Sequence, residues 1–132
     1  MSAHPTIFAD TETGPEVRIR VEGKGTFQTS PGLREFARRM IEEGRRKIII
    51  DLEGCTGMDS TFMGTLAGIA MRLREAGGGD LWVINRSPRS AELLGGLGLD
   101  ALFSDKPVPA GCNGSTAEPV HFPADKAATR AA

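Results

Sequence analysis

The chain has 132 residues, of which 39% are hydrophobic, so its size and composition fit one globular domain with a single core. Its 16 Lys and Arg residues against 17 Asp and Glu residues exclude a broad basic field for nucleic acid or an anionic membrane. The sequence shows no secretory signal, no membrane span and no disulfide framework, which together predict a cytoplasmic protein without nucleic-acid or membrane partners.

The first predicted elements are two strands. Residues 16–21 alternate apolar and charged side chains, which is the period of a strand with one solvent-exposed face. Residues 6–9, with the sequence TIFA, are expected to pair with this strand as a hairpin. Gly14 and Pro15 would form the turn between the two strands.

A helix and a buried strand are predicted next. Ser30 is expected to cap the helix, Pro31 suits its first turn, and Gly44 is expected to end it. Apolar residues repeat at helical spacing between these limits. Residues 48–52 are then almost continuously apolar, which is typical of a strand covered on both faces by helices.

The second half of the predicted domain repeats this alternation. A helix is expected to begin at residues 59–61 and to end at the glycines 77–79. Residues 81–85 form another apolar strand, and the Ser-Pro pair at residues 87–88 starts a third helix. The order β, β, α, β, α, β, α predicts an α/β fold, with helices packed against a small, mostly parallel mixed sheet of about four or five strands.

The chain changes character after Phe103. The domain is therefore expected to cover residues 1–103, and residues 104–132 are rich in Pro, Ala, Gly and charge. We expect this second segment to be a loosely ordered tail, opening with a short edge strand around Val108.

The junction at residues 51–64, with the sequence DLEGCTGMDSTFMG, is the most informative segment. A buried strand ends near Leu52 and a helix begins soon after, and open parallel sheets place their functional groups at strand ends of this kind. Asp59, Ser60 and Thr61 are all competent helix caps. On residue types alone, the plainer interpretation is that they satisfy backbone N–H groups at the helix start.

The order of motifs resembles that of a known family. Asp-Ser-Thr after a hydrophobic strand is followed by a Gly-rich helix, a buried strand and Ser-Pro-x-x-x-x-Leu-Leu, with Gly-Leu and Phe behind it. From the first strand to Phe103, this pattern is similar to the STAS domain of bacterial anti-sigma factor antagonists. The resemblance implies that Ser60 is a phosphorylated serine, Asp59 its acidic neighbour and Thr61 a secondary acceptor.

The resemblance also implies partners and a mechanism. The expected partners are an anti-sigma factor with serine kinase activity and a metal-dependent serine phosphatase. A phosphate on Ser60 would lie at the positive end of a helix and would add negative charge to a docking surface. Binding would therefore fall without a large change of fold.

The sequence departs from the family pattern after the Asp-Ser-Thr motif. The family usually continues with Gly and then Leu, whereas this chain has Phe62 and Met63, and its nearest glycine is Gly64. A Phe at this position would alter the partner-binding surface. The candidates for that surface are Asp59, Ser60, Thr61, Phe62 and Met63.

Two other functions remain open on the sequence. The same fold could serve as a constitutive scaffold subunit of a larger signalling or transport complex, with Ser60 acting as a cap alone. The carboxylates of Asp51, Glu53 and Asp59 could instead line a nucleotide-binding or enzymatic cleft, although no basic or metal-binding companion is visible nearby. We expect no catalytic residue, no metal and no cofactor.

Overall fold

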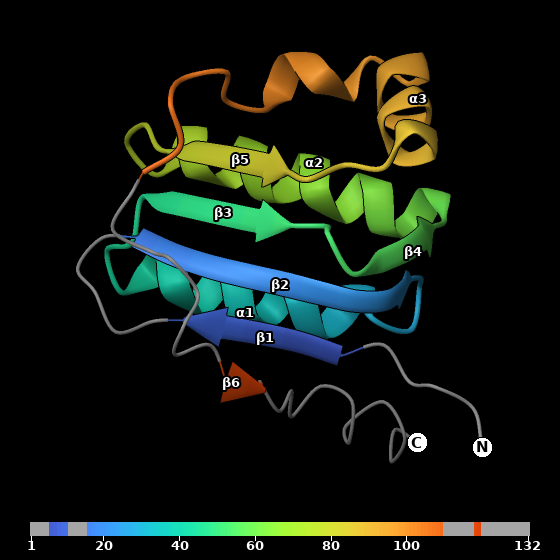
Figure 1. Ribbon diagram of the computed structural model, residues 1–132. Helices are drawn as coiled ribbons and strands as arrows, with labels where there is room; N and C mark the ends of the chain where they lie inside the picture. Colours follow the sequence, from blue (N-terminus) through green and yellow to red (C-terminus); the bar gives the residue numbers. More distant parts are fainter. Residues whose placement is uncertain (1–5, 11–15, 110–117, 120–132) are drawn as a thin grey trace.

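The computed structural model describes residues 6–10, 16–109 and 118–119 (Figure 1). The strands are β1 (Thr6–Asp10), β2 (Glu16–Gly25), β3 (Lys47–Asp51), β4 (Cys55–Met58), β5 (Asp80–Ile84) and β6 (Glu118–Pro119). The helices are α1 (Ser30–Glu42), α2 (Ser60–Glu75), α3 (Pro88–Gly96) and the short 3-10 helix η1 (Leu99–Leu102).

The strands form one mixed sheet in the order β5-β3-β2-β1-β6, with β4 pairing to the C-terminal end of β2. β3 lies parallel to both β2 and β5, and β4 is also parallel to β2. β1 pairs antiparallel with β2, as predicted for a hairpin, although the expected turn lies outside the described residues. The predicted α/β fold with a mostly parallel sheet is therefore confirmed.

The main core lies between the sheet and the helices α1 and α2, which both lie behind the sheet in Figure 1. The alternation in β2 sends Val17, Ile19 and Val21 into this core, where all three are fully buried. The apolar face of α2 is also buried there, including Leu66 and Leu73.

The opposite face of the sheet explains the continuous apolar run of β3. Ile49 packs on that face with Trp82 and Ile84 of β5, in a second cluster that contains no helical residue among those described. The prediction that helices cover both faces of β3 is therefore wrong. The Trp82 ring buries Ile49 instead, and the indole Nε1 donates a hydrogen bond to the Lys106 carbonyl at 2.8 Å.

The two Ser-Pro helix starts behave differently. In α3 the Ser87 hydroxyl accepts a hydrogen bond from the Ser90 N–H at 3.0 Å, which is the geometry of an N-cap. In α1 the cap position is Thr29, whose side chain makes no capping hydrogen bond. The expectation that Ser30 caps α1 is therefore wrong, since the buried Ser30 hydroxyl donates to the Thr26 carbonyl instead.

Two strands, β4 and β6, were not predicted from the sequence. β4 has four residues without apolar alternation, and its pairing with β2 is interrupted by a register shift between Gly23 and Lys24. β6 pairs with β1, while residues 104–109 contain no strand, so the edge strand expected around Val108 is not found. The rest of the predicted tail falls mostly outside the described residues, and the boundary at Phe103 stays a prediction.

Candidate functional site

Asp59 fixes the start of α2 against two other segments. Its backbone has the extended conformation of an N-cap, and its carboxylate Oδ1 accepts from the Phe62 N–H at 2.8 Å. The other carboxylate oxygen, Oδ2, accepts from the Phe27 N–H at 2.8 Å. The Asp59 N–H donates to the Gly25 carbonyl at 2.9 Å. One residue thus holds together the end of β2, the loop before α1 and the first turn of α2.

Ser60 is the first residue of α2, and it is exposed. Thr61 follows it and is exposed as well. Within the described part of the chain, neither side-chain hydroxyl has a hydrogen-bond partner. Ser60 therefore presents a free hydroxyl from a rigid position, and another protein can reach it without unfolding the helix.

Phe62 and Met63 face the opposite way, into the core. Phe62 is fully buried and Met63 is 5% exposed. The Phe62 ring packs so closely over Gly25 that a Cβ atom on that glycine would lie 2.7 Å from it. The partner-binding role predicted for Phe62 and Met63 stays a prediction, and the proposals below use exposed side chains instead.

Phe27 is the neighbour of this site that sequence reasoning missed. Its side chain is 63% exposed, and its backbone N–H is bonded to Asp59 across 32 positions of sequence. The available signal was an isolated aromatic residue in the polar segment GTFQTS, outside any strand or helix pattern. An exposed aromatic ring next to a candidate docking residue is a typical anchor in protein interfaces.

A hollow of about 370 Å³ lies beside Asp59. Asp59 itself lines it, together with Lys24 and Arg89, and neither cation has an ion-pair partner among the described residues. The hydroxyl-bearing residues Thr26 and Thr56 also line it. This set of donors would favour an anionic group beside the start of α2.

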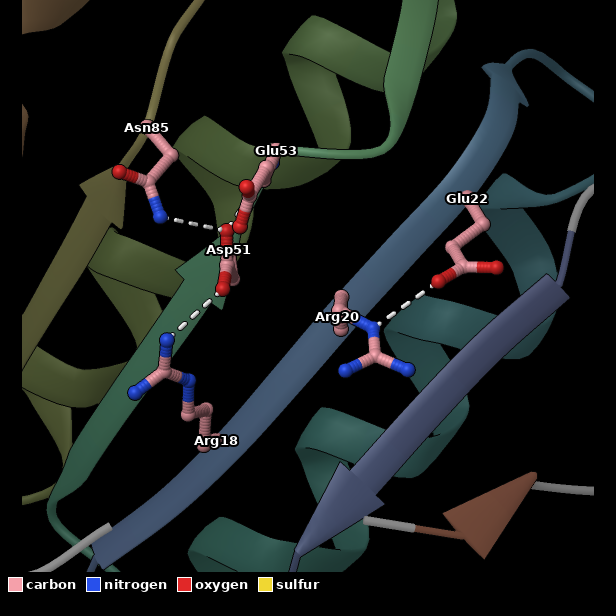
Figure 2. A network of polar contacts seen from close by, with 6 residues as sticks. All are labelled: Arg18, Arg20, Glu22, Asp51, Glu53 and Asn85. Atoms are coloured by element: carbon pink, nitrogen blue, oxygen red, sulfur yellow. Dashed lines mark hydrogen bonds and ion pairs between the residues drawn. The ribbon is translucent and has the colours of Figure 1, made fainter. Parts of the chain in front are cut away.

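A network of polar contacts surrounds the carboxylate of Asp51 at the end of β3 (Figure 2). Its Oδ2 accepts from the Arg18 guanidinium at 2.8 Å, and its Oδ1 accepts from the Asn85 amide at 2.9 Å and the Glu53 N–H at 3.0 Å. Burial acts to raise the pKa of Asp51, but these hydrogen bonds and the Arg18 charge outweigh it and lower the pKa.

These contacts weigh against a cleft built from Asp51, Glu53 and Asp59. The carboxylates of Asp51 and Asp59 are already used to hold strands and loops together. The structure also supplies the basic companion that the sequence did not reveal, since Arg18 lies 33 positions from Asp51. In the described residues, no three His, Cys, Asp or Glu side chains are grouped so that they could hold a metal ion.

Membrane insertion was tested on the same residues. None of the helices in the described part of the chain has both the length and the apolar content required to cross a membrane.

The model of the STAS domain family matches residues 8–110. The solved structure of the anti-sigma factor antagonist SpoIIAA in its unphosphorylated form is 27% identical, with a TM-score of 0.60, over 67% of this chain and 81% of that one. SpoIIAA of Bacillus in the phosphorylated form is 26% identical, with a TM-score of 0.61, over 74% of this chain and 88% of that one.

A third likeness shows the fold alone. An anti-sigma factor antagonist from Mycobacterium paratuberculosis is 21% identical, with a TM-score of 0.64, over 78% of this chain and 87% of that chain. A comparison with curated proteins found no match.

Proposed function

Because the chain belongs to the STAS domain family, we propose that it is an anti-sigma factor antagonist that binds its partner under the control of Ser60 phosphorylation. The partner is an anti-sigma factor with serine kinase activity, and it is bound while Ser60 is unmodified. Phosphorylation of Ser60 releases it, and a metal-dependent serine phosphatase restores binding. The domain works in the cytoplasm by binding and catalyses no reaction itself.

The observation that carries this proposal is the exposed hydroxyl of Ser60 at the first position of α2. Asp59 caps α2, and the Ser60 hydroxyl has no hydrogen-bond partner among the residues that the structure describes. This weakens the interpretation of Ser60 as a cap. The proposal is also supported by the likeness to SpoIIAA, which has been solved in both an unphosphorylated and a phosphorylated form.

The charge of a phosphate gives the switch its physical basis. A phosphoserine carries a charge of about −1.5 to −2, here directly beside the Asp59 carboxylate. The positive end of the α2 dipole stabilises that charge in the free domain, so the fold survives modification. In the complex, the same charge would have to be desolvated beside Asp59. A loss of about 3 to 4 kcal/mol would raise the dissociation constant by roughly two to three orders of magnitude.

Phe27, Ser60 and Thr61 form the docking surface in this proposal. Asp59 fixes the loop of Phe27 to the start of α2, so the aromatic ring and the hydroxyl are presented as one rigid unit. The ring supplies apolar contact area, while Ser60 supplies the group that is modified. Thr61 is the secondary acceptor.

A quantitative pull-down from lysate of the source cell tests the proposal. The baits are the wild-type chain, Ser60→Ala, Ser60→Asp and the matched control Ser104→Asp. The control adds the same charge at a position next to β5, where the Ser104 N–H donates to the Leu81 carbonyl. We expect the wild type, Ser60→Ala and the control to retain an ATP-dependent serine kinase that Ser60→Asp loses. If all four baits retain the same proteins, Ser60 does not control binding and the scaffold function is favoured.

A further inference from the structure

A groove of about 340 Å³ lies between α1 and α2, away from the hollow beside Asp59. From α2 its lining residues recur at the three- and four-residue intervals of one helix face, and they are Thr61, Gly64, Thr65, Gly68, Ile69 and Arg72. That spacing is one stripe along three turns of the helix. The stripe begins at Thr61, immediately after the proposed switch residue, so the groove continues the docking surface described above.

Two glycines on this stripe have no internal explanation. Gly64 and Gly68 are exposed, and a Cβ atom on either would meet nothing within 4 Å. Gly25 differs, because the Phe62 ring occupies the space of its side chain. A glycine inside a helix costs about 1 kcal/mol relative to alanine. The fold thus carries two destabilising residues whose visible effect is to leave the backbone of α2 bare along the groove.

The sides of the groove are positively charged. Arg34 of α1 and Arg72 of α2 line it and are exposed, and neither has an ion-pair partner in the described part of the chain. Arg38 also lines it, but its guanidinium is paired with Glu35 and Glu42. Among the described residues, the groove lining contains no carboxylate, although the whole chain has a formal net charge of −1.

We propose that this groove binds an acidic amphipathic helix of the same partner that Ser60 controls, an inference that rests on the proposed function. The bare backbone at Gly64 and Gly68 lets a second helix approach closely. Apolar residues of that helix would pack against the glycine backbone, over the buried Ala37 and Ile69, while its carboxylates would pair with Arg34 and Arg72. A helix suits the site because its backbone hydrogen bonds are internal, whereas an extended segment would need backbone partners.

Charge reversal tests the electrostatic part of this inference. The probe is a fluorescein-labelled peptide of about 18 residues, long enough for a helix of ~27 Å, with Leu and Ala on one face and Glu on the other. Binding to the full chain is measured by fluorescence anisotropy at low salt. Arg34→Glu/Arg72→Glu should raise the dissociation constant at least about tenfold. The matched control Arg39→Glu/Arg74→Glu changes the net charge equally outside the groove and should bind like the wild type.

Filling the groove tests its shape. Gly64→Gln/Gly68→Gln should raise the dissociation constant by a similar factor, while its thermal midpoint, followed by circular dichroism, should equal or exceed that of the wild type because helix glycines are removed. A folded glycine variant that binds the peptide like the wild type would overturn the inference. Equal binding by the charge-reversed chain and its control, or no saturable binding to the wild type, would overturn it as well.

Failure of this inference can be told apart from failure of the proposed function. The peptide assay reports on the groove, whereas the pull-down with Ser60→Asp reports on the switch. If the peptide binds through the groove but the kinase is retained equally by Ser60→Asp and the wild type, the switch alone is refuted. Flotation with phosphatidylglycerol vesicles gives a further outcome. If the wild type floats and Arg34→Glu/Arg72→Glu does not, the groove serves an anionic membrane and the acidic-helix inference is wrong.

Discussion

Replacing Asp59 by alanine should loosen the two segments that meet at the start of α2. The wild-type carboxylate accepts one hydrogen bond from the Phe62 N–H and another from the Phe27 N–H, both at 2.8 Å. Asp59→Ala removes both acceptors at once. The first turn of α2 loses its cap, and the loop that carries Phe27 loses its connection to the helix.

The expected magnitude follows from these two contacts. Loss of an N-cap costs about 1 kcal/mol, and loss of a further hydrogen bond to a charged acceptor in a partly exposed setting costs about 1 kcal/mol more. Asp59→Ala should therefore lower the free energy of unfolding by about 2 kcal/mol. Asp59→Asn should lose about half of this, because a carboxamide has a single acceptor oxygen.

Ser87→Ala is the matched comparison, since Ser87 caps α3 through one side-chain hydrogen bond. It should cost about 1 kcal/mol. Urea unfolding followed by circular dichroism measures all three variants, and a loss of 2 kcal/mol should lower the midpoint by about 1 M. If Asp59→Ala were no more destabilising than Ser87→Ala, the bond to Phe27 would contribute nothing and the rigid docking unit would be refuted.

Three further predictions test other parts of the structure. Gly25→Ala should cost about 1 to 3 kcal/mol in urea unfolding, because its Cβ would lie 2.7 Å from the Phe62 ring, while Gly57→Ala, with open space around it, should stay within about 0.5 kcal/mol of the wild type. The folded-state pKa of Asp51 lies below its ordinary value of 3.8, so its stabilisation is full above that pH and is lost as pH falls through the folded value. Asp51→Asn should therefore flatten the fall in unfolding free energy as the pH drops below 3.8, and an unchanged slope would contradict this account. Phe27→Ala should leave the free energy of unfolding within about 0.5 kcal/mol of the wild type but raise the dissociation constant for the captured kinase about 30-fold in calorimetry. An unchanged affinity would exclude Phe27 from the docking surface.

The central elements could be predicted because their signals are local. Alternation marks β2, continuous apolar runs mark β3 and β5, and a stripe of apolar residues marks α2. β4 could not be predicted, since its pairing with β2 changes register part-way and its four residues carry no period of their own. The same limit applies to β3, whose second apolar face is closed by a tryptophan and not by a helix.

The candidate site also combines features that the local sequence predicts with contacts that only the folded chain creates. Asp59 as a cap and Ser60 beside it follow from residue types near a strand end. Phe27 does not, because only the folded chain brings its N–H to the Asp59 carboxylate. The partners of Asp51 are also distant in sequence, so its carboxylate appeared available in the sequence although the fold uses it fully. The cap predicted at Ser30 does not form because a buried hydroxyl can bond backward to a turn as readily as forward to a helix.

The central claim is that a phosphate on Ser60 controls binding, and one measurement tests it most directly. The chain is produced with phosphoserine at position 60, and the affinity of the captured kinase is measured by calorimetry for the modified and unmodified forms. The account predicts a dissociation constant at least about 100-fold higher for the phosphorylated chain, with an unchanged circular dichroism spectrum. Equal affinity of the two forms would contradict the account.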